Sequence, residues 1–123
     1  MTAVILDPQA VSRGLLNSVL TNGGHQVVGD MNISPANLTR AVNLKPQIVC
    51  VDIGQADGEG LALLDEIRGA LPKTLIFIVS NSLDSGMVEA ALQHGAHGFI
   101  VKPFNSVTVL QTIRNTVLKV ARR

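Results

Sequence analysis

Short apolar runs alternate along the chain with longer segments in which apolar side chains recur at helical spacing. The apolar runs predict strands at Ala3–Leu6, Gln26–Gly29, Ile48–Val51, Leu75–Val79 and Gly98–Val101. Strands that alternate with helices predict parallel pairing, because each crossover helix returns the chain to start the next strand in the same direction. Four of the runs are almost entirely apolar, which is typical of strands covered by helices on both faces of a sheet.

Five segments of helical spacing complete the pattern. The first ends at Asn22-Gly23-Gly24, the second runs from Ser34-Pro35 to about Leu44, the third from about Glu59 to Arg68, the fourth from Asp84 to His94 before Gly95, and Asn105 caps the fifth. The side chains expected to face the sheet include Val11, Leu15, Leu16, Val19 and Leu20, then Met87, Val88, Ala91 and Leu92, and finally Val107, Leu110, Ile113, Val117 and Val120. The fold class predicted is α/β, a doubly wound (βα)5 five-stranded parallel sheet, for which the strand order 2-1-3-4-5 is common.

Length and composition favour one domain over residues 1–123. Hydrophobic residues make up 46% of the chain and charged residues 15%, which is enough apolar material for a core. The net charge of +1 and the three phenylalanines as sole aromatics give no reason to expect nucleic acid or a flat cofactor. No run approaches the ~20 apolar residues of a membrane-spanning helix, and no signal-peptide pattern begins the chain, so we expect a cytoplasmic protein without a membrane partner.

Polar residues follow the four inner strands: Asp7, Asp52, Ser80 and Lys102. Each alone has an ordinary structural explanation as a cap, a turn residue or a solvated charge. Because the carboxyl ends of parallel strands meet at one edge of the sheet, where such proteins bind ligands, the four together predict a functional site. Asp30 follows the second strand at the sheet edge and is expected to lie away from this site.

These residue types suit phosphoryl transfer to a carboxylate, with Asp52 as the nucleophile. The charges of Asp7 and Asp52 repel each other and an incoming phosphate, so a divalent cation with oxygen ligands is expected, and Mg²⁺ is the natural candidate. Lys102 is suited to pair with phosphoryl oxygens, and the Ser80 hydroxyl to donate to the same group.

The chain resembles, over essentially its whole length, the receiver domains of two-component response regulators (CheY-like domains). Gly95-Ala96-His97-Gly98-Phe99-Ile100-Val101-Lys102-Pro103-Phe104 is similar to the family signature G-A-x-G-[YF]-[ILV]-x-K-P-[FL]. Val51-Asp52 and Glu59-Gly60-Leu61 also stand at the spacing of the family's phosphoacceptor loop. The resemblance implies the flavodoxin-like fold and a phosphoryl group accepted on Asp52 from a histidine kinase or phosphotransfer protein.

The same resemblance implies roles for individual residues. Asp7, Asp52 and the backbone carbonyl of Gly54 would be the metal ligands, and Lys102 and Ser80 would contact the phosphoryl group. Phe99 would change rotamer on phosphorylation, and the Lys102–Pro103 bond would be cis. A downstream target or output domain would bind the surface made by the fourth helix, the fifth strand and the fifth helix.

Pro8 is the main departure from the family pattern, in which two adjacent acids end the first strand and the second touches the metal. Proline suits the first position of a helix, and we expect Pro8 to take this position in the first helix. With one carboxylate fewer, Mg²⁺ is expected to bind weakly. The loop Gly54-Gln55-Ala56 is also atypical. Two functions stay open: a phosphorylatable switch, whose only catalysis is its own phosphoryl transfer and hydrolysis, and a degenerate receiver that binds proteins without phosphorylation.

An aspartyl-phosphate phosphatase or a flavin carrier fits less well. The phosphatase needs a second acid two residues beyond its nucleophile, but Asp7 is followed by Pro8-Gln9. A flavodoxin needs a hydroxyl-rich loop after the first strand and aromatic residues around the ring, and the sequence has neither. His94 and His97 are interpreted as structural, because Gly95 breaks the helix between them, and lone Cys50 as a buried thiol.

Overall fold

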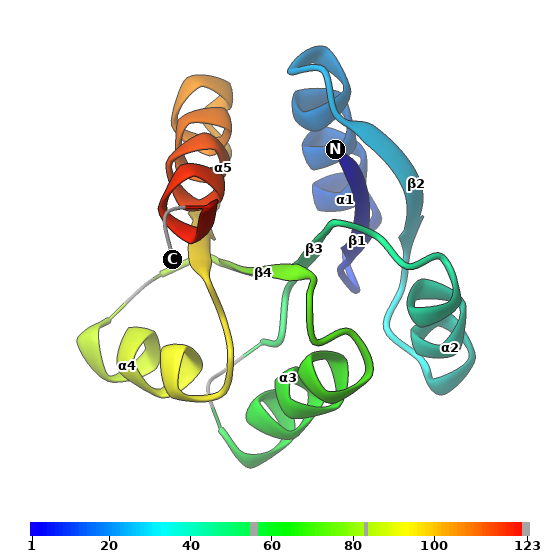
Figure 1. Ribbon diagram of the computed structural model, residues 1–123, viewed down its shortest axis with the longest axis vertical. Helices are drawn as coiled ribbons and strands as arrows, with labels where there is room; N and C mark the ends of the chain where they lie inside the picture. The colour runs from blue at the N-terminus through cyan, green and yellow to red at the C-terminus, as the bar shows by residue number, and fades with distance from the viewer. Residues whose placement is uncertain (55–56, 83, 122–123) are drawn as a thin grey trace.

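The computed structural model describes residues 1–54, 57–82 and 84–121. Its strands are β1 (Thr2–Leu6), β2 (Gln26–Met31), β3 (Ile48–Val51), β4 (Leu75–Ser80) and β5 (Gly98–Val101). Its helices are α1 (Ala10–Asn22), α2 (Pro35–Asn43), α3 (Gly58–Ala70), α4 (Ser85–Gln93) and α5 (Ser106–Ala121). All strand pairs are parallel, in the order β2-β1-β3-β4-β5, so the predicted fold class and strand order are confirmed (Figure 1).

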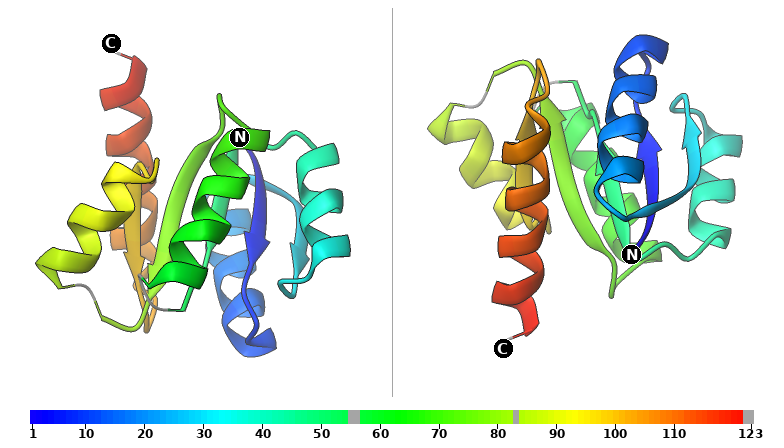
Figure 2. Two further views of the ribbon diagram at one scale, coloured as in Figure 1. Left: turned by 90° about the horizontal axis from the view of Figure 1, so that it is seen from below. Right: turned by 90° about the horizontal axis from the view of Figure 1, so that it is seen from above.

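Helices cover both faces of the sheet. Figure 2 shows α2, α3 and α4 in front of one face, and α1 and α5 in front of the other. Alternate side chains of each inner strand enter the two layers: Val49 and Val51 pack with the first group of helices, and Ile48 and Cys50 with the second. Burial also raises the pKa of the Cys50 thiol to about 12, as expected of a thiol that serves only packing.

The residues predicted to cap helices lie at helix termini in the structure. The Ser34 hydroxyl accepts a hydrogen bond from the Asn37 N–H at 3.1 Å, and the Asn105 side chain accepts one from the Thr108 N–H at 3.0 Å. Gly95, which follows the C-cap residue of α4, takes the left-handed conformation with φ of 104°. Short-range sequence signals therefore set most element boundaries to within a few residues.

Four of the side chains predicted to face the sheet are instead exposed: Val11 (76%), Leu15 (57%), Leu92 (50%) and Val107 (72%). The buried stripe of α1 runs through Leu16 and Leu20, so Val11 and Leu15, which are four residues apart, share the opposite face. In α5 the buried positions are Val109 and Ile113, and Val107 lies two residues earlier, about half a turn away. Apolar spacing predicted these helices correctly but not which apolar side chains they bury.

Within the described residues, no helix is long and apolar enough to cross a membrane.

Candidate functional site

Three of the four predicted site residues meet at the carboxyl edge of the sheet. The Lys102 ammonium lies 2.8 Å from Asp52 Oδ2 and 2.9 Å from Asp7 Oδ2. The side chains of Asp7 and Lys102 are 3% and 9% exposed, and that of Asp52 is 15% exposed. The two carboxylates are thus bridged by one cation, and Asp52 is the one that solvent reaches most.

Backbone hydrogen bonds position these residues by continuing the sheet beyond its strands. The Asp52 N–H donates to the Leu6 carbonyl at 2.9 Å, which aligns Asp52 beside the end of β1. The Lys102 N–H donates to the Ser80 carbonyl at 2.8 Å, which aligns Lys102 beside the end of β4. The side chains therefore meet because the register of the parallel strands places their ends side by side.

Electrostatics keep Lys102 charged. Burial lowers the pKa of Lys102, but its hydrogen bonds to Asp52 and Asp7, together with their negative charges, outweigh burial and raise the pKa. The ammonium compensates one of the two carboxylate charges. The edge of the sheet therefore keeps an excess negative charge that attracts a further cation.

The second oxygen of Asp52 also has a partner. Asp52 Oδ1 accepts a hydrogen bond from the Gly54 N–H at 2.8 Å. Gly54 has φ of 78°, a left-handed conformation that glycine adopts without strain, and a Cβ there would meet open space. The neighbouring loop positions 55 and 56, which include the atypical Gln55-Ala56 pair, lie outside the described residues.

Pro8 does not occupy the first helical position, so that prediction is wrong. Helix α1 begins at Ala10 with Gln9 as its N-cap residue, and Pro8 is exposed in the preceding turn. The reason is that Asp7 Oδ1 accepts a hydrogen bond from the Gln9 N–H at 2.8 Å, which closes a turn around Pro8 before the helix starts. Proline has no side-chain oxygen, so position 8 contributes none to this site.

Gln9 is a site residue that sequence reasoning missed. Its Oε1 atom lies 3.2 Å from the Lys102 ammonium and accepts a hydrogen bond from it. Glutamine carries no motif, and the contact joins positions that lie far apart in the chain. No sequence signal marked it, because the structure alone shows that the helix begins at Ala10 and that Gln9 is its N-cap residue.

Ser80 lies at the same edge but faces the β4–α4 loop. Its hydroxyl donates to the Ser82 carbonyl at 2.8 Å, lies 3.9 Å from the Met87 sulfur, and accepts from the Ser82 N–H at 3.3 Å. No hydrogen bond joins it to the described Asp52 or Lys102 side chains. It is also the last residue of β4 rather than the first residue after it.

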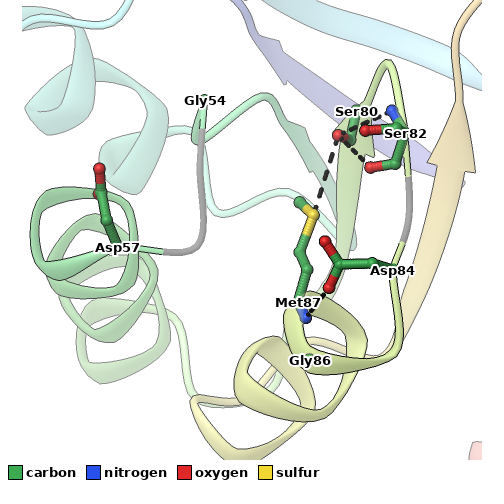
Figure 3. Close-up of a pocket in the computed structure, with 7 residues that line it drawn as sticks. All are labelled: Gly54, Asp57, Ser80, Ser82, Asp84, Gly86 and Met87. Carbon is green, nitrogen blue, oxygen red and sulfur yellow. Dashed lines mark hydrogen bonds between the residues drawn. The ribbon is translucent and has the colours of Figure 1, made fainter.

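A pocket of about 400 Å³ is lined by Gly54 on one side and by Ser80 and Met87 on the other (Figure 3). Asp57 and Asp84 stand at its rim, where each carboxylate caps a helix by accepting a backbone N–H, from Gly60 at 3.0 Å and from Met87 at 2.8 Å. The space between Gly54 and Ser80 is therefore open, and polar side chains such as Asp57 and Asp84 line it.

Two further predicted features lie on β5 and the segment after it. Phe99 is half-buried and packs against the core layer of α2, α3 and α4, beside Ile78 of β4. The Lys102–Pro103 bond is cis, as predicted.

The donor set fits a hard divalent cation, because two carboxylate oxygens, Asp7 Oδ2 and Asp52 Oδ2, already converge on one positive charge. Asp7, Asp52 and the Gly54 carbonyl would hold Mg²⁺. The described residues contain no cluster of three or more His, Cys, Asp or Glu side chains suited to a metal, so such a cation would depend on two carboxylates and neutral oxygens.

The two histidines near α4 have structural partners. His94 Nδ1 pairs with Asp65 Oδ1 at 2.7 Å, which links α4 to α3. His97 Nδ1 accepts a hydrogen bond from the Ile76 N–H at 3.0 Å. Both contacts agree with the structural interpretation of these residues.

The strand order and the site at the carboxyl edge define a flavodoxin-like α/β protein. The family model of the response regulator receiver domain matches residues 3–114, and the chain belongs to this family. Receiver domains of this type are signalling switches, consistent with two-component signalling, and are generally associated with Mg²⁺.

Chemotaxis protein CheY of Thermotoga maritima is 31% identical over 110 residues, which cover 89% of this chain and 92% of that protein. Chemotaxis protein CheY of Bacillus subtilis is 30% identical over 114 residues, covering 93% and 95%. The crystal structure of a response regulator from Thermotoga maritima superposes with a TM-score of 0.83 at 23% identity, over 94% of this chain and 96% of that one, which supports the fold.

Proposed function

We propose that this protein is a phosphorylatable switch that accepts a phosphoryl group on Asp52 from a histidine kinase or a phosphotransfer protein. The observation that carries the proposal is the ion-paired edge of the sheet, where Lys102 bridges Asp52 at 2.8 Å and Asp7 at 2.9 Å. Asp52 is the more exposed of the two carboxylates, so a donor reaches it more easily than it reaches Asp7.

In the proposed reaction, a carboxylate oxygen of Asp52 attacks the phosphorus of a phosphohistidine. A P–O bond forms and the P–N bond breaks, and the electron pair of the broken bond stays on the imidazole, which leaves as a neutral group because its other ring nitrogen carries a proton. Asp7, Asp52 and the Gly54 carbonyl would hold Mg²⁺, which would supply positive charge to offset the negative charges of the reacting groups. Lys102 provides the protein's own cation for these oxygens, and the Gly54 N–H orients the Asp52 carboxylate from its other side.

The change in surface would begin at Ser80. To donate to a phosphoryl group on Asp52, the Ser80 hydroxyl must leave the Ser82 carbonyl, and the β4–α4 loop must then rearrange. Phe99 lies on the adjacent strand and would follow into the space this opens. Leu92 of α4 and Val101 of β5 are exposed apolar side chains, which a protein bound at the surface of α4, β5 and α5 would bury.

A degenerate receiver that binds proteins without phosphorylation is the second candidate. Pro8 favours it, because the residue is exposed in its turn and brings no carboxylate to the site. Both candidates share the surface of α4, β5 and α5, for a separate target or an output domain. Both also assume one domain over residues 1–123 in the cytoplasm, without membrane or nucleic-acid partners.

Intact-mass spectrometry after incubation with acetyl phosphate and Mg²⁺ tests the proposal. We expect the natural chain to gain the mass of one phosphoryl group and Asp52→Asn to gain none. Asp57→Asn is the matched control, since asparagine still caps α3, and this variant should be modified like the natural chain. Absence of added mass on the natural chain at high Mg²⁺ would favour the degenerate receiver.

A further inference from the structure

The Lys102 ammonium has three N–H donors and no acceptor, and three side-chain oxygens surround it. They are Asp52 Oδ2 at 2.8 Å, Asp7 Oδ2 at 2.9 Å and Gln9 Oε1 at 3.2 Å. Two of these acceptors are carboxylates from the ends of inner strands. The third is a neutral amide from the start of α1, and with it the described side chains offer three acceptors, one for each N–H of the ammonium.

The Gln9 side chain is directed at the ammonium rather than used for its helix. Gln9 is the N-cap residue of α1, yet its side chain accepts no backbone hydrogen bond from the first turn. Gln9 Oε1 instead accepts from both the Lys102 ammonium and the Ser12 hydroxyl, each at 3.2 Å. Because both groups donate to this atom, the amide must present its oxygen, and not its NH₂ group, to the site.

Two hydrogen bonds hold the backbone of the turn that leads to Gln9. Its N–H donates to Asp7 Oδ1 at 2.8 Å, and the Asp7 carbonyl accepts from the Arg13 guanidinium at 2.7 Å. Pro8 lies between these residues with its φ fixed by the ring. The turn that lacks a second acid therefore delivers an amide oxygen to the lysine from a restrained backbone.

We propose that Gln9 is a positioning residue that completes the acceptors of Lys102 and holds the ammonium between Asp7 and Asp52 as an internal counter-ion. This inference rests on the proposed function, because it concerns control of the same site. A divalent cation that enters between the carboxylates competes with the ammonium for the same oxygens. By holding the ammonium without adding negative charge, Gln9 raises the Mg²⁺ concentration that the site requires.

The first test uses the metal-free protein and follows proton exchange of the Lys102 ammonium by ¹H–¹⁵N NMR. Gln9→Ala should speed exchange with water by about two- to tenfold, the range expected for losing one ordinary hydrogen bond. Gln9→Asn is the matched variant, because its shorter side chain caps α1 well but does not reach Lys102. It should speed exchange as Gln9→Ala does, while its thermal midpoint stays equal to that of the natural chain or rises.

The second test is a double-mutant cycle with Lys102→Met, read as the Mg²⁺ dissociation constant from NMR titration. Gln9→Ala should tighten Mg²⁺ binding by about two- to tenfold in the natural chain and leave it unchanged in the Lys102→Met background. Unchanged proton exchange in both Gln9 variants would overturn the proposal. So would the same change of Mg²⁺ affinity in both backgrounds, or a weakening, since Gln9 would then act on the cation itself.

These readouts need no phosphoryl transfer. If Asp52 never gains a phosphoryl group but Gln9→Ala frees the ammonium, the proposed function fails and the role of Gln9 stands. If Asp52 is phosphorylated and Gln9→Ala changes neither readout, the proposed function stands and the role of Gln9 fails.

Discussion

Two proline-containing turns meet at the site, and they differ in how far the sequence predicts what each contributes. In Lys102-Pro103-Phe104 the residue before proline is the lysine of a recognisable motif, and in Asp7-Pro8-Gln9 it is an aspartate followed by no second acid. The two charged residues pair at 2.9 Å, so each turn contributes one half of an ion pair. The sequence predicted the site residue of each turn, Lys102 and Asp7, but the contribution of Gln9 to the second turn shows only in three dimensions.

The largest effect is expected on Mg²⁺ affinity when a carboxylate is added to the turn that contains Pro8. Pro8→Asp should add a third carboxylate and tighten Mg²⁺ binding by about 1–3 kcal/mol, or roughly ten- to a hundredfold in dissociation constant, because a charge-assisted ligand is gained. Pro8→Ala is the control, since it removes the ring without adding charge. Equal Mg²⁺ midpoints for the natural chain and Pro8→Asp, measured by titration during phosphorylation, would show that the missing acid has no effect.

A second variant removes the positive charge that the turn at Lys102-Pro103 brings to the site. Lys102→Met should lower the free energy of unfolding at neutral pH by about 1–3 kcal/mol, because it leaves Asp7 and Asp52 close together without a compensating cation. Lys73→Met is the control, since Lys73 is exposed and pairs with no described carboxylate. Similar urea midpoints for the two variants would mean that the Lys102 ion pairs do not contribute to stability.

The same ion pairs predict a pH dependence. The pKa of Lys102 is raised in the folded protein, so the ion pairs contribute their full stability below the ordinary lysine pKa of 10.5 and lose it as pH rises through the higher folded value. Unfolding of the natural chain should therefore become easier in strongly alkaline solution by more than that of Lys102→Met. If the free energies of unfolding of the two proteins changed in parallel above pH 10.5, the raised pKa of Lys102 would be contradicted.

The smallest effect compares the helices that follow the two turns. Asn105 caps α5 through its side chain, and Asn105→Ala should lower the free energy of unfolding by about 0.5–2 kcal/mol. Gln9 makes no such bond to α1, so Gln9→Ala should cost about half as much or less. A larger loss for Gln9→Ala in urea unfolding would mean that its side chain supports the helix rather than the site.

Local sequence signals predicted most of the fold. Strands such as Ile48–Val51 are continuous apolar runs, and Ser34, Gly95 and Asn105 mark helix ends through short-range hydrogen bonds or backbone conformation. Spacing alone could not decide the burial of Leu92 or Val107, because which face of a helix is buried depends on how the helix packs on the sheet.

Some residues of the site could likewise be predicted from the sequence, and others could not. Asp7, Asp52 and Lys102 could be predicted to converge, because strand ends in a parallel sheet meet at one edge. The contact of Gln9 with Lys102 depends on a turn closed by the Asp7 side chain, and the direction of the Ser80 hydroxyl depends on the β4–α4 loop. Neither contact follows from the hydrophobic pattern.

The most direct test of the switch is a comparison of amide NMR spectra with and without beryllofluoride, a phosphate mimic, in the presence of Mg²⁺. If phosphorylation of Asp52 shifts a pre-existing equilibrium, resonances should move at the strand ends and also around Phe99, Leu92 and Val101 on the surface of α4, β5 and α5. Asp52→Asn should show neither change. Shifts confined to the strand ends of the natural chain would contradict the account.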